Sequence, residues 1–302
     1  MRGIVPLTGL HLLLTYQCTL ACDHCFVWSS PEARGTMRLT EVREILRQAK
    51  AFGGIEWIFF EGGEPFLFYS LLLKSVRLAA RSGFKVGIVS NGYWATGVRE
   101  ARETLLPFRR LVQDLSISSD LYHGEDEAGK LAENAVAAAK GLGIPCGILS
   151  VAQPEDADAA RRVGQLPPGV SAVMYRGRAA RTLVSRARLR PWTEMGTCPY
   201  ENLRDPARVH VGPEGSVVLC QGISLGNLFE KPLREIMEEY DPRAHPIVGP
   251  LLGGGPVALA RRYGVRHRRS YADACHLCDE TRRALRRRFP AILSPSQMYG
   301  TR

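Results

Sequence analysis

The chain carries, at residues 10–25, the stretch LHLLLTYQCTLACDHC. Its apolar run ends at Tyr16 and predicts a buried strand, and Cys18, Cys22 and Cys25 follow directly in a C-x3-C-x2-C arrangement. Three thiolates on one short loop can hold three irons of a cubane iron–sulfur cluster, whose usual quota is four cysteines. The fourth iron is then open for an exchangeable ligand. Zinc sites more often show paired C-x2-C units, and a disulfide would need an oxidising compartment, so the spacing favours a [4Fe-4S] cluster.

A second motif, GGEP at residues 62–65, follows the strand-like run Ile55–Phe60. Together with the three cysteines, it resembles the motifs of the radical S-adenosylmethionine (SAM) enzymes. The resemblance implies that the open iron chelates the amino and carboxylate groups of the methionine part of SAM. It also implies that Gly62, Gly63 and Glu64 contact SAM, since glycine has no side chain to keep the backbone away from a ligand.

The resemblance further implies a reaction. The cluster held by Cys18, Cys22 and Cys25, the expected catalytic residues, donates one electron to SAM, which is cleaved to methionine and a 5′-deoxyadenosyl radical. That radical takes a hydrogen atom from the substrate in a site that must exclude water. An electron donor such as flavodoxin or ferredoxin is the partner that this chemistry requires.

Apolar runs of strand type alternate with helical patterns through the first 190 residues, which predicts an α/β fold with a parallel sheet. Helical spacing of apolar residues appears at 42–49, 72–80 and 131–140. The family resemblance implies a partial (β/α)6 TIM-like barrel over residues 1–190. Strands are predicted at Leu10–Tyr16, Ile55–Phe60, Val86–Ser90, Leu115–Ser118, Gly147–Val151 and Val170–Tyr175.

In such folds, ligands collect at the C-terminal ends of the strands, which adds Asn91 and Ser118 to the expected SAM-binding residues. Both could equally be ordinary turn residues. The segment ISSD at 117–120 looks like one in relatives whose serine meets the SAM carboxylate. Lys130 stands nearest to the position where relatives place an arginine, and His24 stands where they place an aromatic residue against the adenine.

After residue 190 a second module, residues 191–302, carries four more cysteines. Residues 210–220 read as a β-hairpin around GPEG, and residues 232–240 read as a helix. This pattern resembles the twitch domain, a short form of the SPASM domain, and implies a small β-hairpin/helix domain with an auxiliary [4Fe-4S] cluster and a basic C-terminal tail. The alternative is a structural zinc site. The expected metal ligands are Cys198, Cys220, Cys275 and Cys278.

Composition bounds the remaining possibilities. The 302 residues are 45% hydrophobic, no apolar run is long enough to span a membrane, and the N-terminus does not read as a signal peptide. Eight cysteines in a chain of this size fit metal sites in a reducing cytoplasm better than a disulfide framework. Residues 253–256, GGGP, read as a flexible connection rather than a phosphate loop.

The net charge is +10, and arginines gather at 170–190 and 261–288. This imbalance predicts a surface for an anionic peptide or small-molecule substrate, with Arg282, Arg283 and Arg286 as its test positions. The sequence thus predicts an enzyme that abstracts hydrogen from a peptide or small molecule, with the auxiliary cluster assisting oxidation or bond formation, as in peptide maturation or dehydrogenation. The alternatives are a radical SAM enzyme that modifies RNA and, less well supported, a zinc-stabilised nucleic-acid-binding protein.

Overall fold

The computed structural model describes residues 6–123, 126–156, 166 and 170–301. Its main feature is an open nine-stranded sheet in the order β10-β9-β8-β1-β2-β3-β4-β5-β6. The strands β1 to β6 run parallel, and β8 pairs in parallel with β1 on the other side. The sheet strands are β1 (Gly9–Thr15), β2 (Trp57–Gly62), β3 (Lys85–Ser90), β4 (Asp114–Ser118), β5 (Cys146–Val151), β6 (Val170–Ser171), β8 (Arg208–Val211), β9 (Ser216–Cys220) and β10 (Ile223–Asn227).

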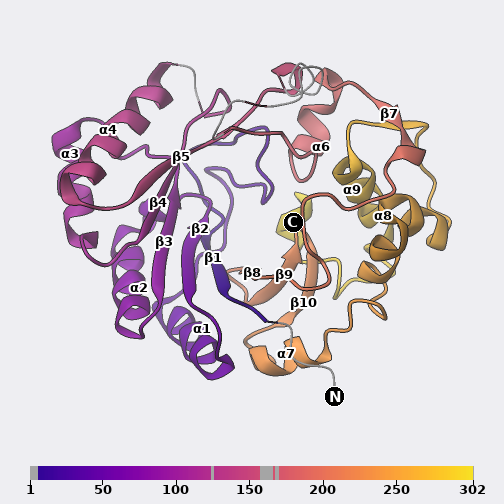
Figure 1. Ribbon diagram of the computed structural model, residues 1–302, viewed down its shortest axis with the longest axis horizontal. Coiled ribbons are helices and arrows are strands. Elements are labelled where there is room, and N and C mark those ends of the chain that lie inside the picture. Colours follow the sequence, from indigo (N-terminus) through magenta and orange to yellow (C-terminus); the bar gives the residue numbers. More distant parts are fainter. Residues whose placement is uncertain (1–5, 124–125, 157–165, 167–169, 302) are drawn as a thin grey trace.

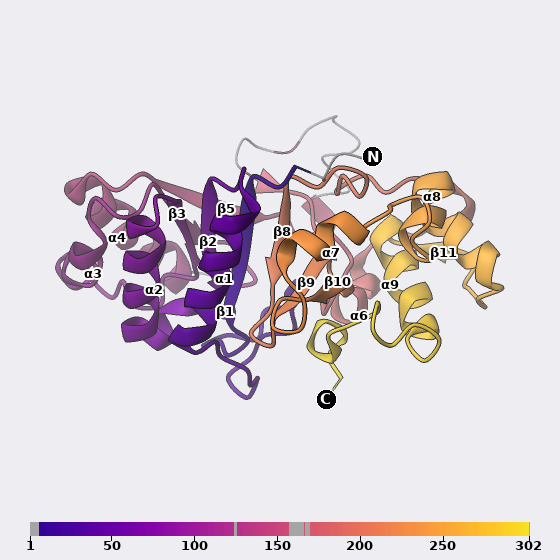
Figure 2. The same cartoon turned by 90° about the horizontal axis from the view of Figure 1, so that it is seen from below.

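Helices wrap the outside of the parallel strands (Figure 1), as the alternating pattern predicts. The periodic residues of the first helix, Val42, Ile45, Leu46 and Ala49, are all buried. Figure 2 shows these helices at one end of an elongated body and α8 and α9 at the other. The helices are α1 (Leu39–Phe52), α2 (Tyr69–Arg81), α3 (Val98–Leu105), α4 (Asp126–Leu142), α6 (Ala179–Thr182), α7 (Leu233–Glu239), α8 (Val248–Tyr263) and α9 (Ala274–Leu285).

The elements of the predicted fold are present, and the α/β class with an unclosed parallel sheet is confirmed. The strand predicted at Val170–Tyr175 is shorter, because only Val170–Ser171 pairs with β5. Val173 and Tyr175 instead turn into a small separate hydrophobic cluster. Short 3-10 helices complete the fold at Pro65–Phe68, Leu106–Phe108, Val184–Arg186, Trp192–Glu194 and Ser296–Tyr299.

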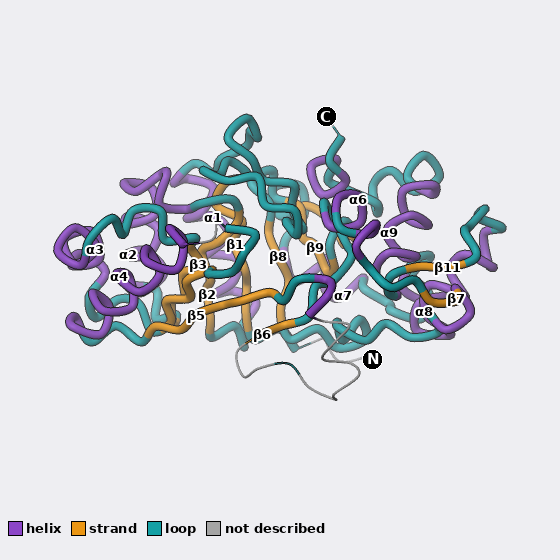
Figure 3. The backbone as a smooth tube through the Cα atoms, turned by 90° about the horizontal axis from the view of Figure 1, so that it is seen from above, coloured by secondary structure: helices purple, strands orange, loops and turns teal. Residues whose placement is uncertain are grey.

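The second module continues the first sheet (Figure 3). The predicted hairpin is formed by β8 and β9, and β10, which the sequence reading missed, adds an antiparallel strand. One hydrophobic core runs from Leu10 in β1 to Met298 near the C-terminus, so residues on both sides of position 190 pack together. The division at residue 190 stays a prediction. A two-stranded sheet of β7 (Arg190–Pro191) and β11 (Ser270–Tyr271) joins the start of this module to α9.

Residues 253–256 do not form the flexible connection that the sequence suggested. They lie inside α8, where non-helical dihedral angles at Gly254 and Gly255 kink the helix. A Cβ on Gly255 would lie 2.4 Å from the backbone nitrogen of Thr197, so glycine lets the kink press against the segment that leads into Cys198. The helix of the basic C-terminal region, α9, stops at Leu285. In the described part of the chain, the helices are too short or too polar to cross a membrane.

Candidate functional site

The three-cysteine loop leaves the C-terminal end of β1, as predicted. Cys18 is buried and Cys22 and Cys25 are half-buried, and all three are free thiols. Burial, together with the neighbouring thiols of Cys25 and Cys18, raises the pKa of Cys22 to about 12, so the structure brings the three side chains together. Arg178 fastens the loop by donating to the Cys22 carbonyl at 2.7 Å and to the Ser29 carbonyl at 2.6 Å.

The number and arrangement of these sulfur atoms bear on which metal group they can bind. Among the described residues, no three thiol sulfurs lie within 4.8 Å of one another. Tetrahedral zinc with bonds of ~2.3 Å would hold its sulfurs at about 3.8 Å. Three cysteine ligands on one loop are one fewer than a [4Fe-4S] cluster usually takes, which leaves one iron open.

Backbone hydrogen bonds hold the GGE motif, residues 62–64, against the C-terminal end of β1. Gly63 N donates to the Thr15 carbonyl at 2.7 Å, and Glu64 N donates to the Gln17 carbonyl at 2.9 Å. A Cβ on Gly63 would lie 2.0 Å from that Gln17 oxygen, and Gly62 has a φ of +129° that other residues rarely adopt. The two glycines are therefore required for the motif to lie against the residue that precedes Cys18.

Glu64 was expected to touch SAM, and its surroundings indicate a positioning role. The side chain is fully buried, and its carboxylate accepts from Phe66 N at 2.9 Å, Asn91 N at 2.8 Å and the Ser90 hydroxyl at 3.0 Å. Burial raises the pKa of Glu64 to about 7, while the Asn91 and Phe66 N–H groups oppose that rise. Glu64 thus ties the end of β3 to the end of β2.

Asn91 continues this connection to the cysteine loop. Its Nδ2 donates to Thr19 Oγ1 at 2.9 Å and lies 3.6 Å from Cys18 Sγ. The structure therefore brings this predicted residue into the site, where it braces a cysteine. The ends of β1, β2 and β3 form one hydrogen-bonded unit around the loop.

His24 packs in an aromatic pocket, as the adenine-facing position would require. Its ring centroid lies 4.6 Å from Tyr122 and 5.3 Å from His123, and Asp120 contacts His123 Nδ1 at 2.7 Å. Burial lowers the pKa of His24 to about 4, and its Nδ1 is buried without a partner. The sequence reading missed Tyr122 and His123, although their position just after the ISSD segment was the available signal.

Ser118 and Lys130, both predicted to bind SAM, lie on different kinds of element: one ends a strand and the other is on a helix. Ser118 is half-buried at the C-terminal end of β4, the edge where the other motif residues gather. Lys130 is exposed on α4, and no hydrogen bond or ion pair links it to the described residues of this site. Contact of either residue with SAM stays a prediction.

The four cysteines of the second module also lie close to one another. Cys220 ends β9, Cys275 and Cys278 lie on the first turns of α9, and Cys198 precedes β8. Cys220 raises the thiol pKa of each of the other three, with burial as the larger cause, and Cys278 does the same for Cys198 and Cys275. These thiols too have no three sulfurs within 4.8 Å. The auxiliary cluster on these four cysteines stays a prediction, with zinc as its alternative.

A partly buried arginine lies between the two cysteine groups. Arg176 Nη1 lies 3.8 Å from Cys220 Sγ and 3.2 Å from Glu201, and its guanidinium lies 5.5 Å from the ring centre of Phe26. Phe26 directly follows Cys25. One side chain thus connects the loop of the first group with a sulfur of the second.

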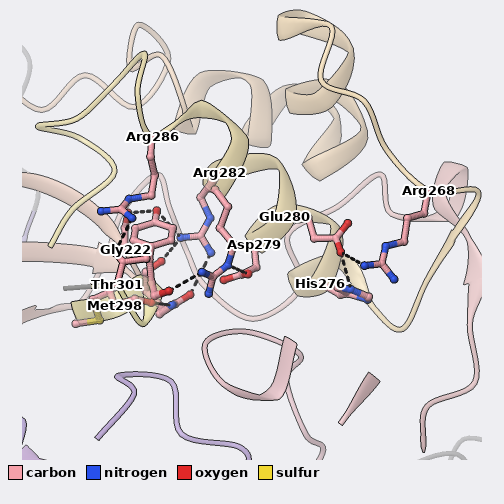
Figure 4. Close-up of polar contacts among 12 residues, drawn as sticks. Gly222, Arg268, His276, Asp279, Glu280, Arg282, Arg286, Met298 and Thr301 are labelled. Carbon is pink, nitrogen blue, oxygen red and sulfur yellow. Dashed lines mark hydrogen bonds and ion pairs between the residues drawn. The ribbon is translucent and has the colours of Figure 1, made fainter. Parts of the chain in front are cut away.

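The arginines chosen as test positions for an anionic surface are structural instead (Figure 4). Arg282 is 1% exposed and donates to the Gln221 side chain and carbonyl, and Arg283 binds Asp279 and the Tyr299 carbonyl. Arg286 donates to Thr301 Oγ1 at 2.7 Å and Ser296 Oγ at 2.9 Å. The prediction of a docking surface at these positions was wrong, because Arg282 is buried and Arg283 and Arg286 donate to residues 296–301 of the C-terminal segment.

Comparison with known proteins agrees with this geometry. The model of the radical SAM superfamily matches residues 12–162, half of the chain. "Putative peptide biosynthesis protein YydG" of Bacillus subtilis (strain 168) is 32% identical over 111 residues, which cover 36% of this chain and 35% of that protein. The chain therefore matches about a third of that relative's length.

Two solved structures share the fold at low sequence identity. SuiB of Streptococcus suis bound to S-adenosylmethionine gives a TM-score of 0.56 at 15% identity, covering 81% of this chain and 68% of SuiB, and SuiB has also been crystallised with its precursor peptide SuiA. Native anSMEcpe with bound AdoMet and the Cp18Cys peptide gives a TM-score of 0.51 at 15% identity, covering 94% and 97%. Family model, motif geometry and fold lead to one conclusion: the chain belongs to the radical SAM superfamily.

Proposed function

We propose that this radical SAM enzyme modifies a peptide substrate, with an auxiliary [4Fe-4S] cluster on Cys198, Cys220, Cys275 and Cys278 assisting oxidation or bond formation. The observation that carries the proposal is the Arg176 connection. It joins Phe26, next to Cys25, to Cys220, so one side chain reaches from the loop of the first group to a sulfur of the second. A substrate bound beside Arg176 would lie near both groups.

The side chains around the first group have distinct tasks in this proposal. Cys18, Cys22 and Cys25 hold the SAM-binding cluster, and when bound that cluster supplies the electron for reductive cleavage of SAM. Asn91 and Arg178 keep the cysteine loop in place through Thr19 and the Cys22 carbonyl. His24 and Tyr122 form an apolar wall against which the adenine can stack.

Around the second cysteine group, positively charged side chains compensate the negative charge of the thiolates. Four thiolates in a buried place are unfavourable unless cations compensate them. Arg176 lies at Cys220, and the buried Arg282 interacts with Cys278, so two fixed positive charges border the group. Such charges stabilise the more reduced, more negative form of a bound cluster, which suits a cluster that accepts an electron.

The peptide class is supported by the relatives rather than by a contact in this chain. YydG carries peptide biosynthesis in its name, SuiB binds a precursor peptide, and anSMEcpe binds the Cp18Cys peptide. The exposed arginines 261, 262, 266 and 287 remain available to an acidic segment of such a peptide. A flavodoxin or ferredoxin would deliver the electron.

Anaerobic reconstitution tests the proposal directly. The wild-type protein should bind about eight irons, and replacing Cys198, Cys220, Cys275 and Cys278 by alanine should remove about four while 5′-deoxyadenosine is still formed. Cys146→Ala, at the opposite end of its strand, is the matched control and should keep all irons. Four irons in the wild-type protein, or zinc in place of the second four, would reject the auxiliary cluster.

A further inference from the structure

Two histidines and a glutamate that belong to neither cysteine group meet on one face of the sheet. His11 in β1, Glu61 in β2 and His210 in β8 come from three adjacent strands. His11 pairs directly with His210 and with Phe59, two residues before Glu61, so all of them project from the same face. The opposite face carries the fully buried core residues Leu10, Leu12, Ile58 and Phe60.

The ligand-type atoms of the trio converge. Glu61 Oε2 lies 3.3 Å from His11 Nδ1, and Glu61 Oε1 lies 3.1 Å from His210 Nε2. The three side chains each offer an atom within 4.8 Å of the other two. For bonds of 2.0–2.1 Å in a tetrahedral site, neighbouring ligand atoms would lie about 3.3 Å apart, close to the distance between each Glu61 oxygen and its own histidine.

The contact between Glu61 and His210 is an ion pair whose angles fall short of a hydrogen bond. Glu61 Oε1 is buried and has no hydrogen-bond partner, although His210 Nε2 is only 3.1 Å away. A buried carboxylate oxygen without a donor costs free energy. A metal ion between the nitrogen and the oxygen would bind both atoms and satisfy this buried oxygen.

The trio is also held rigidly. The His11 ring stacks on Phe59 at a centroid distance of 4.6 Å and an interplanar angle of 14°, and His210 lies 5.6 Å from Phe26. The side chains are 14–17% exposed, so they are largely shielded from water yet reachable from the interior. Ligands on paired strands, fixed by aromatic neighbours, need little reorganisation to bind.

We propose that His11, Glu61 and His210 form a binding site for a divalent first-row transition-metal ion, in a two-histidine, one-carboxylate arrangement. Imidazole and carboxylate suit zinc, iron and manganese, whereas the thiolates elsewhere in the chain suit iron–sulfur clusters. Three protein ligands leave at least one coordination position, which a substrate oxygen or nitrogen in the interior can occupy. The site does not depend on the proposed auxiliary cluster.

Zinc retention by the cluster-loaded protein tests the site by difference, because any zinc held by cysteines would be common to wild type and to variants of the trio. After equilibrium dialysis against buffered zinc under anaerobic conditions, elemental analysis should find one more zinc per chain in wild type than in those variants. Loss of a mere supporting residue weakens metal affinity by about 10–100-fold, so His210→Ala and Glu61→Gln should lose at least that much. His267→Gln, at an exposed histidine outside the trio, should retain zinc like the wild type.

Two further measurements keep the outcome decisive. Iron content must be unchanged in every variant, which shows that the fold and the clusters persist, and anomalous scattering at the zinc edge should place the ion between His11, Glu61 and His210. Because a bound ion stabilises the folded state, zinc should also raise the melting temperature of wild type but not of His210→Ala. Absence of zinc from the wild-type protein, or equal zinc in His210→Ala, would show a hydrogen-bonded trio without a metal and overturn the proposal.

Discussion

The two cysteine groups of this molecule are built in opposite ways. The first, Cys18, Cys22 and Cys25, occupies one short loop after β1, so its ligands are neighbours in the chain. The second gathers Cys198, Cys220 and the Cys275/Cys278 pair from three distant segments that meet around β9 and α9. A local site is visible in its spacing, whereas a site made of distant segments exists only once the surrounding core is folded.

The largest effect is expected when the first cysteine group, which lies on one loop, is removed. Replacing Cys18, Cys22 and Cys25 together by alanine should abolish 5′-deoxyadenosine formation under dithionite, because SAM then has no cluster to receive an electron from. About four irons should remain at the second group, since its ligands and its core lie elsewhere. The measurement is product formation by chromatography beside an iron count; SAM cleavage at the wild-type rate would contradict the assignment.

The second group should depend on its buried scaffold. Arg282→Gln removes a fully buried charge that holds Gln221 and interacts with Cys278, and should lower the free energy of unfolding by about 3–5 kcal/mol. Arg287→Gln, at an exposed arginine just beyond the end of α9, should change it by less than about 0.5 kcal/mol. Urea denaturation of both anaerobic proteins provides the comparison, and equal midpoints would mean that Arg282 is not structural.

The first group should depend on one close backbone contact. Gly63→Ala would place a Cβ 2.0 Å from the Gln17 carbonyl and so push the GGE motif away from the cysteine loop. Overpacking of this kind costs about 1–3 kcal/mol, and SAM affinity should fall by about tenfold or more. Gly147→Ala in β5, where a Cβ would meet nothing within 4 Å, is the control. Calorimetric SAM titration that gives the same dissociation constant for both variants would argue against the role of this contact.

The smallest effect is expected at the end of β4. Ser118→Ala should weaken SAM binding by one hydrogen bond, about 0.5–1.5 kcal/mol, without any loss of iron. Ser119→Ala, the neighbouring position, should leave SAM affinity unchanged. An unaltered dissociation constant for Ser118→Ala would remove this residue from the binding site and leave the edge formed by β1, β2 and β3 as its centre.

The sequence predicted best those features whose residues are close together in the chain. The C-x3-C-x2-C run, the GGE motif and the strand–helix alternation predicted the family, the fold class and the edge of the sheet that carries the site. Asn91 could also be placed there, since a residue that follows a parallel strand must lie at that edge. Its brace on Thr19 and Cys18 could not be predicted, because it joins loops far apart in the chain.

Only the tertiary structure decided how charged and polar side chains are used. The sequence predicted an anion-binding surface at Arg282, Arg283 and Arg286, yet Arg282 is buried and the other two donate to the C-terminal segment. His11, Glu61 and His210 carry no motif at all and meet only because β8 pairs with β1. The physical reason is common to both cases. Spacing along the chain fixes which residues can share a loop or a strand face, while burial and partners depend on which distant segments pack together.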